Sequence, residues 1–378
     1  MSLRMGGWSM EAHEDLVAVP AMLALARESR GMTQADLAAA MSRLDGANRV
    51  SQGYVSRAEA GRLQVKDDRL ALYAEALGYT PEMLCRTTDT HGVGVGLVHH
   101  RKRASMGATS LRRIHATLAL TRLQVESLTA RLTDLGNHGF RHIEVDDLDT
   151  PEDAAATLRE EWDISRGPID DLVSVIEAAG ASVVVRDLGT ADLDAVSQWP
   201  AGSPPLFLLN STAPGDRFRF SLAHELGHVV MHTEPGEGRL QEQQADRFAA
   251  EFLMPHDAIL PELRPGVDLQ RLMELKTRWG VSMAALIRRA LSLGVISEWQ
   301  YRNLMVEMSA LGYRTVEPVT VQRETPRQIA QVVTRLEQQH HLDLTHAAHL
   351  AGLGHEEFHE IYLCASSSSG AVVTPAHL

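Results

Sequence analysis

The sequence predicts a mainly α-helical fold of the α+β class, because helical periodicity dominates it and strand signals are few. Apolar residues recur at three- and four-residue spacings through much of the chain, in 16–30, 34–41, 70–77, 154–162, 169–179 and 240–311. Two short runs carry the strand signal, and turn residues bound each of them: ASVVVR at 181–186 and PLFLL at 205–209. This pattern fits a small sheet packed against helices and does not fit a parallel α/β fold.

The composition is that of a globular cytosolic protein. Apolar residues make up 44% of the chain and charged residues 22%, which is enough to build hydrophobic cores and too apolar for disorder. Cys85 and Cys364 lie far apart and form neither a ligand pair nor a disulfide framework, which favours a reducing compartment. No stretch approaches the roughly 20 apolar residues of a membrane helix, so we expect no membrane contact.

Charge is distributed unevenly along the chain. The net charge is −13, but residues 1–115 carry 15 Lys and Arg against 12 Asp and Glu, a net +3, so the remainder carries −16. A modestly basic nucleic-acid module on an acidic body would produce this asymmetry. A body that is simply acidic also accounts for much of it.

Two short helices with a polar outer face are predicted near the N-terminus. Thr33 caps the first, which turns Leu37 and Met41 inward, and Ser51 caps the second. Gln can pair with adenine, Arg with guanine or phosphate, and Ser or Tyr with the DNA backbone, so the second helix has the side chains of a groove reader. Its outward residues are Gln52, Tyr54, Ser56 and Arg57.

The segments MTQADLAAAM and VSQGYVSRAEAGR resemble the XRE (Cro/repressor-like) helix-turn-helix family over about residues 16–88. The resemblance implies a five-helix domain that binds a double-stranded DNA operator, and a homodimer that meets paired half-sites. The turn between the two helices is several residues longer than the family pattern, which leaves the docking angle open. A helical domain used only for protein contacts is the alternative. The candidate DNA contacts are Thr33, Gln34, Gln52, Tyr54, Ser56 and Arg57.

A second motif lies in RFRFSLAHELGHVVMH at residues 217–232. Residues four apart share a helix face, so His224 and His228 project side by side and can reach one ion. Glu225 lies at the edge of that face, where a carboxylate can deprotonate a metal-activated water without being a ligand. The pattern predicts a metal-dependent hydrolase, and a structural or silent metal site is the alternative.

The next predicted helix, LQEQQADRFAAEFLMP, supplies two carboxylates four residues apart. Glu242 and Asp246 offer a third ligand and a group that orients an imidazole. Two His, one Glu and an open position form the ligand set of hydrolytic zinc sites. We therefore expect one Zn²⁺ per chain, with another divalent ion as the alternative. Glu251, more than two turns from Glu242, is a competing third ligand.

The chain resembles the ImmA/IrrE family of metallopeptidases from about residue 98 to residue 318. The segments that carry the resemblance are HRKRAS, REEW, GPIDDLVSVIEAAG, FSLAHELGHVVMH, EQQADRFAAEFLMP, LKTRWGVSMAALIRRA and MSALGYRTVEP. The resemblance implies His224, His228 and Glu242 as metal ligands and Glu225 as catalytic base, with Asp246 behind an imidazole by analogy with other peptidases. His232, one turn beyond, is a candidate for contact with substrate or a developing oxyanion. A solvent-facing histidine at the helix end is the alternative for His232.

Five segments are expected along the chain. They are a helix-turn-helix domain at 1–88, a linker at 89–110, a zinc metallopeptidase domain at 111–265, a helical subdomain at 266–318, and C-terminal helices with a disordered tail at 319–378. The helical subdomain looks like a second helix-turn-helix, in which Arg288 and Arg289 could serve DNA. Its Leu and Met stripe is typical of a core, so we expect a scaffold.

The two resemblances together imply a transcriptional regulator in the bacterial cytosol, associated with the nucleoid when bound to DNA. Its zinc endopeptidase would cleave a repressor-like protein and relieve repression during stress or mobile-element induction. The alternative is a DNA-binding regulator or antitoxin-like protein whose metal domain senses or dimerises without proteolysis. A purely degradative peptidase fits poorly, because such an enzyme gains nothing from a DNA-binding module.

Overall fold

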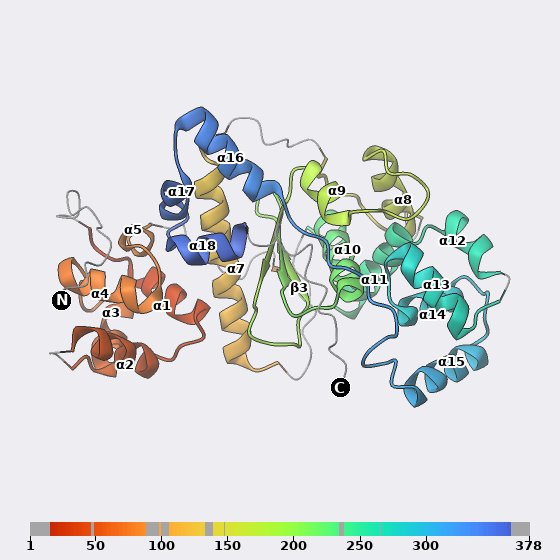
Figure 1. Ribbon diagram of the computed structural model, residues 1–378, viewed down its shortest axis with the longest axis horizontal. Coiled ribbons are helices and arrows are strands. Elements are labelled where there is room, and N and C mark those ends of the chain that lie inside the picture. Colours follow the sequence, from red (N-terminus) through yellow and green to blue (C-terminus); the bar gives the residue numbers. More distant parts are fainter. Residues whose placement is uncertain are drawn as a thin grey trace, which may run out of the picture.

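The computed structural model places the N-terminal helices at one end of an elongated molecule, a small sheet in the middle and further helices beyond it (Figure 1). The residues described are 16–46, 49–87, 98–99, 106–132, 139–146, 148–233, 238–264 and 266–363. Most of the predicted linker at 89–110 and the predicted tail beyond residue 363 lie outside them. Within the described ranges, no helix is long and apolar enough to cross a bilayer. The predicted mainly α fold with a small sheet is confirmed.

Five helices make up the described part of residues 16–87, which we call the N-terminal domain. They are α1 (Pro20–Ser29), α2 (Gln34–Asp45), α3 (Gln52–Glu59), α4 (Asp67–Leu77) and α5 (Pro81–Leu84). Thr33 caps α2 in a reciprocal capping box with Asp36, and the Ser51 hydroxyl accepts a backbone N–H in the first turn of α3. Arg27 of α1 holds Glu59 of α3 through hydrogen bonds of 2.6 and 2.9 Å. The predicted five-helix domain and both predicted caps are confirmed.

In the described chain, four strands form one sheet in the order β1-β3-β4-β2. They are β1 (Val98–His99), β2 (Ser182–Arg186), β3 (Ala195–Gln198) and β4 (Leu206–Asn210). β2 is parallel to β4, whereas β3 is antiparallel to both β1 and β4. The two predicted apolar runs form β2 and β4. The sequence does not predict β3, because AVSQ is too short to show an alternating pattern.

The sheet separates two hydrophobic clusters of the described chain. Successive strand residues point to opposite faces, so Val184 and Leu208 join one cluster, and Val183 and Phe207 join the other. The first face packs on α7 (Ala108–Thr129) and on the side of the molecule that carries the N-terminal domain. The second face packs on α10 (Gly215–Met231). The HELGH motif therefore lies against the face of the sheet away from the N-terminal domain.

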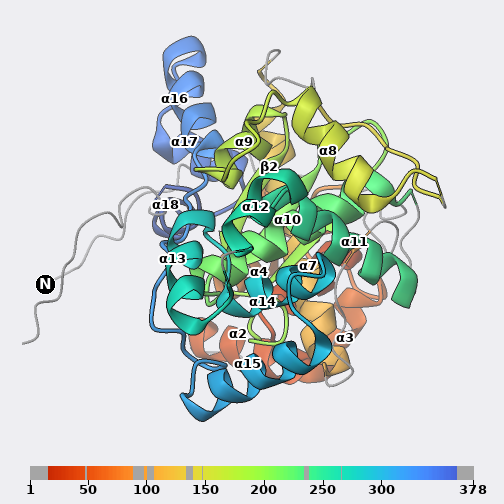
Figure 2. The same ribbon diagram turned by 90° about the vertical axis from the view of Figure 1, so that its right-hand side faces the viewer.

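The remaining helices of the second cluster surround α10 and extend to the far end of the molecule. They are α8 (Pro151–Glu161), α9 (Leu172–Ala178), α11 (Arg239–Leu253), α12 (His256–Leu263), α13 (Leu269–Trp279), α14 (Met283–Ser292) and α15 (Glu298–Ala310). Seen along the long axis, α13, α14 and α15 stand in front of α10 and of the N-terminal helices (Figure 2). The predicted second helix-turn-helix corresponds to α13 and α14.

The α13–α14 pair buries its apolar stripe in the second hydrophobic cluster. Gly280 ends α13 in the left-handed region at φ 65°, and Leu275 and Leu286 of the apolar stripe are fully buried. Arg289 is also buried, where it forms an ion pair with Glu251 and donates to the Met254 carbonyl. The alternative in which Arg289 serves DNA is therefore wrong, whereas Arg288 is exposed.

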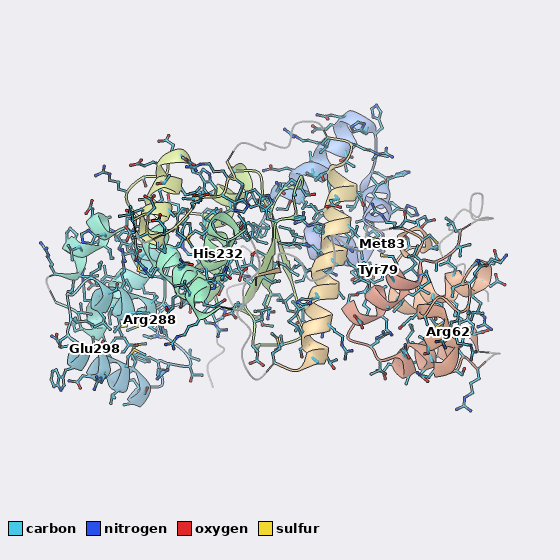
Figure 3. The ribbon with its side chains drawn as sticks, turned by 180° about the vertical axis from the view of Figure 1, so that it is seen from behind. Arg62, Tyr79, Met83, His232, Arg288 and Glu298 are labelled. Atoms are coloured by element: carbon cyan, nitrogen blue, oxygen red, sulfur yellow. The ribbon has the colours of Figure 1, made fainter. Side chains whose placement is uncertain are left out.

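Three C-terminal helices return along α7 to the N-terminal domain (Figure 1). They are α16 (Gln328–His340), α17 (Leu344–Leu350) and α18 (His355–Tyr362). Leu353 pairs with Tyr79 in an isolated antiparallel bridge, and the Thr80 amide donates to the Gly352 carbonyl at 2.9 Å. Tyr79 and Met83 lie on the side of the N-terminal domain that faces this junction (Figure 3).

Candidate metal centre and DNA-binding surface

The helix that carries HELGH packs closely against α11. All residues of α10 from Leu222 to Met231 are buried. A Cβ placed on Gly227 would lie 2.9 Å from the Phe248 ring of α11, closer than real Cβ contacts. Gly227 therefore allows the two helices to approach so that polar side chains of both can meet.

His224, His228 and Glu242 converge at this contact. Their ligand atoms all lie within 4.8 Å of one another. The two Nε2 atoms are 3.1 Å apart, and Glu242 carboxylate oxygens lie 3.6 Å from that of His224 and 3.3 Å from that of His228. Atoms bound at ~2.0–2.1 Å to a tetrahedral zinc ion lie roughly 3.4 Å apart. The spacing and the nitrogen–oxygen donor set therefore fit a single zinc ion.

The rear nitrogens of both histidines also have partners. Nδ1 of His224 lies 2.9 Å from a carboxylate oxygen of Asp246. Nδ1 of His228 lies 3.0 Å from Nδ1 of His232, whose Nε2 is 3.1 Å from Oε1 of Gln244. Such partners fix the ring orientation and tautomer of a metal-binding imidazole.

Glu225 points toward the sheet and is 2% exposed. The Ser197 hydroxyl of β3 donates to Oε2 of Glu225 at 2.6 Å. Burial raises the pKa of Glu225, against the nearby charges of His228 and His224 and against this hydrogen bond. A carboxyl group with raised proton affinity is suited to take a proton near neutral pH.

Opposing effects set the charge of His224 and Glu242. Burial disfavours protonation of His224, but hydrogen bonds with Asp246 and Glu242 raise its pKa to about 9. Burial also disfavours ionisation of Glu242, yet hydrogen bonds from His224 and His228 hold its pKa well below the usual range. Glu242 is therefore ionised beside the two imidazoles, which is the charge that a divalent cation requires.

The structure contradicts two alternatives that the sequence left open: a solvent-facing His232 and Glu251 as the third ligand. His232 is 6% exposed, so it is not a solvent-facing histidine. Its ring lies at the rear nitrogen of His228, and burial together with the charge of His228 lowers its pKa to about 4. Glu251 binds Arg289 and accepts from the His256 amide, which takes it away from the ligand cluster. Glu251 as a competing third ligand is therefore wrong.

The predicted DNA contacts lie on α2 and α3, at the end of the molecule away from α11 (Figure 1). Gln52 and Arg57 are exposed on α3, and Tyr54 and Ser56 are half-buried. Gln52 donates to the Gln34 side chain at 2.7 Å, so the two glutamines form a pair across the two helices. Thr33 is occupied in capping α2. Side chains from both helices thus share one polar surface.

Ser197 and Gln244 are the contacts that the sequence does not reveal. Ser197 lies in a strand with no pattern of its own, and only the pairing of β3 beside α10 brings it to Glu225. Gln244 is one of several glutamines in QEQQ, and nothing in that run distinguishes it. The i, i+4 spacing from Glu242 to Asp246 brackets Gln244, but it does not mark the residue as a partner of His232.

Comparison with known protein families agrees with both parts of this description. The family described as helix-turn-helix matches residues 23–84, and the family described as IrrE N-terminal-like domain matches residues 176–291. No curated protein gives a significant match to the chain. The second match spans the sheet strands β2 to β4, α10 and α11. The chain therefore joins an N-terminal helix-turn-helix domain of the XRE type to an ImmA/IrrE-like peptidase domain.

Proposed function

We propose that this protein is a DNA-binding transcriptional regulator whose peptidase domain is a zinc-dependent endopeptidase. Its substrate would be a repressor-like protein, and cleavage would relieve repression in a stress or mobile-element response. The convergence of His224, His228 and Glu242 beside Glu225 is the observation that supports this proposal.

His224, His228 and Glu242 would hold the ion, with Asp246 orienting the first imidazole. A zinc ion supplies a Lewis acid that activates water and polarises the scissile carbonyl. Glu225 takes a proton from the attacking water and returns it to the leaving amine. Ser197 restrains one oxygen of Glu225 and leaves the other for this exchange.

The N-terminal domain would bring the peptidase to an operator. Gln52 and Arg57 are exposed on α3 and can reach base edges, and Gln34 supports Gln52 from α2. A double-stranded operator with paired half-sites would be bound by a homodimer, as is usual for single helix-turn-helix modules.

One observation favours a second candidate function. Glu225 and His228 are only 2% and 1% exposed, so much of the candidate site is closed to solvent. A buried metal site of this kind would also serve a regulator that senses the ion or dimerises through it without proteolysis.

Replacement of Glu225 by Gln separates the two functions, because it removes the base and keeps the metal ligands. We expect E225Q to bind zinc and DNA like the wild type. It should also lose the induced transcriptional response and the new protein N-termini that terminal proteomics detects in wild-type cells. H228A, as a control, should lose zinc as well. An unchanged response in E225Q would exclude proteolysis as the function and favour sensing.

A further inference from the structure

A hydrogen-bonded chain runs from α10 to α11 behind the candidate metal centre. It begins at Nδ1 of His228, passes through the imidazole of His232 over a contact of 3.0 Å, and ends at Oε1 of Gln244 over a contact of 3.1 Å. The rings of His228 and His232 are 5.0 Å apart and tilted by 54°, so they meet through nitrogens and do not stack. His232 is the C-cap of α10, and its extended backbone (φ −113°, ψ 116°) ends the helix there. Its ring contacts that of His228, one turn earlier in the helix.

The positions of the protons along this hydrogen-bonded chain follow from the position of the ligand atoms of His224 and Glu242 relative to His228. Nε2 of His228 faces the other ligand atoms, so in the metal-bound state it would present a lone pair and the ring proton would lie on Nδ1. That N–H can donate to His232 only if Nδ1 of His232 is an acceptor, which places the proton of His232 on Nε2. The second N–H then donates to the carbonyl oxygen of the Gln244 amide. Donors and acceptors alternate without conflict from one end to the other.

The other tautomer of His232 would break this order at both ends. A proton on Nδ1 of His232 would face the proton on Nδ1 of His228, and Nε2 would face the amide oxygen of Gln244 with no hydrogen between them. The amide oxygen of Gln244 and the Nδ1–H of His228 therefore favour the same form of His232, which is the form that accompanies the metal-binding form of His228. The two histidine ligands differ in what orients them, because the carboxylate of Asp246 lies directly behind the ring of His224.

We propose that His232 and Gln244 are positioning residues that hold His228 in the tautomer able to bind the metal, a role that rests on the proposed zinc site. His232 acts behind the ligand and does not contact the substrate. Gln244, on α11 beside the ligand Glu242, couples the two helices that supply the site. Removal of a partner of this kind typically costs 10–100-fold in metal affinity.

Matched variants test the acceptor at each position. H232L has a branch at the position of Nδ1 but no acceptor, whereas H232N places an amide oxygen near the same point. Q244L removes the terminal acceptor, and Q243L makes the same change at the exposed neighbouring residue. Each full-length variant is stripped of metal, and its zinc affinity is measured in competition with a chromophoric chelator. NMR of imidazole nitrogens reports the tautomer of His228 in the metal-free protein.

We expect H232L and Q244L to bind zinc 10–100-fold more weakly than the wild type, with a mixture of tautomers at His228. H232N and Q243L should bind zinc as tightly as the wild type does, which general destabilisation of the helix end would not allow for H232N. Wild-type affinity in both H232L and Q244L, or failure of H232N to restore it, would overturn the positioning role while leaving the zinc site intact. A wild type that binds no zinc would overturn both the role and the proposed function.

Discussion

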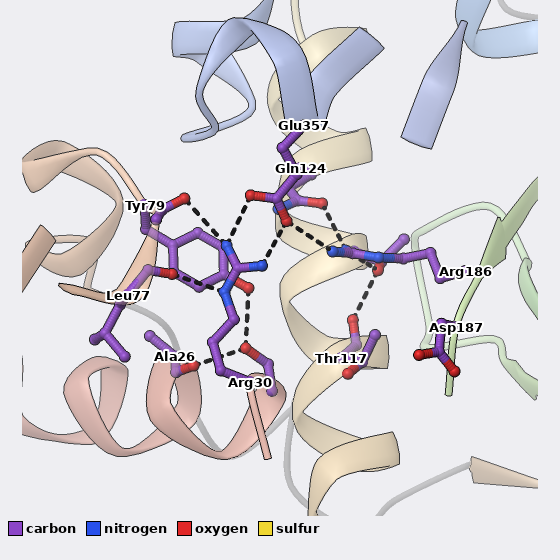
Figure 4. A network of polar contacts seen from close by, with 12 residues as sticks. Ala26, Arg30, Leu77, Tyr79, Thr117, Gln124, Arg186, Asp187 and Glu357 are labelled. Carbon is purple, nitrogen blue, oxygen red and sulfur yellow. Dashed lines mark hydrogen bonds and ion pairs between the residues drawn. The ribbon is translucent and has the colours of Figure 1, made fainter. Parts of the chain in front are cut away.

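Glu357 of α18 holds Arg30 at the end of α1, through contacts of 2.5 and 2.8 Å between their charged groups (Figure 4). The Arg30 guanidinium also lies 4.3 Å from the centre of the Tyr79 ring. On its other side Glu357 is 3.7 Å from Arg186, the last residue of β2. One carboxylate at the C-terminal end of the chain thus joins the N-terminal domain to the sheet of the peptidase domain. This contact acts together with the Leu353–Tyr79 bridge and the Thr80–Gly352 hydrogen bond to hold the N-terminal domain on the rest of the molecule.

Replacement of Glu357 by Ala should loosen this junction. We expect a loss of about 1–2 kcal/mol in the free energy of unfolding, because a half-buried, doubly hydrogen-bonded ion pair is lost. The Thr80 amide, which donates to Gly352, should exchange its hydrogen faster. Hydrogen exchange with mass spectrometry checks this, and E356A at the exposed neighbour is the control. Equal exchange in E357A and E356A would show that the ion pair does not hold the two parts together.

Replacement of Ser197 by Ala should shift the pH dependence of peptide hydrolysis. The Ser197 hydroxyl donates to the ionised form of Glu225, so its loss raises the pKa of Glu225 further. The acidic limb of the rate profile should therefore move to higher pH, with activity retained above it. A quenched fluorescent peptide selected from a library with the wild type provides the assay. An acidic limb at the wild-type pH would mean that Ser197 does not act on the base.

Those parts of the candidate site whose residues lie close together in the sequence could be predicted from the sequence. His224, Glu225 and His228 share one helix, so their mutual placement follows from helix geometry alone. The exposure of Gln52 and Arg57 on α3 is predictable for the same reason. Glu242 could be proposed as a ligand from its spacing to Asp246, although only the packing at Gly227 brings α11 close enough for the contact.

Contacts between distant segments were beyond the reach of sequence periodicity. Ser197 meets Glu225 because β3 pairs between β1 and β4, and AVSQ carries no signal for that pairing. The ring of His232 is buried by α11, so helix position alone suggested a solvent-facing or substrate-facing residue. Glu357 and Arg30 are 327 residues apart, and no local pattern relates them.

Replacement of Gly227 by Ala should push α10 and α11 apart. The added Cβ would meet the Phe248 ring at 2.9 Å, and overpacking of this kind costs about 1–3 kcal/mol. Alanine recovers up to about 1 kcal/mol through its helix propensity, so we expect a net loss of stability. Zinc affinity should fall too, because Glu242 moves away from the histidines. Denaturant unfolding and zinc competition measure the two effects, with G238A, where a Cβ meets nothing, as the control. Stability and affinity equal to the control would contradict the close helix contact.

Stability should fall as the pH rises through 7 because of Glu177 in α9. Burial raises the pKa of Glu177 to about 7, although the backbone amides of Arg327 and Gln328 at the start of α16 donate to its carboxylate. The folded state therefore binds the proton more tightly than the unfolded chain, where the pKa is about 4.5. The stabilising contribution is complete below pH 4.5 and is lost progressively up to and beyond pH 7.

The variant E177Q isolates this contribution, because its amide oxygen can still accept from the two backbone N–H groups but does not titrate. As the pH rises from 5 to 8, we expect the unfolding free energy of the wild type to fall relative to that of E177Q. E356Q, at an exposed position, should show no such change. Because Glu177 holds the first turn of α16, the same pH rise should lower the protection factors of the α16 amides, corrected for the intrinsic exchange rate at each pH, in the wild type and leave those of E177Q unchanged. A pH-independent difference between wild type and E177Q would mean that Glu177 is ionised throughout, and that the amides at the start of α16 outweigh its burial.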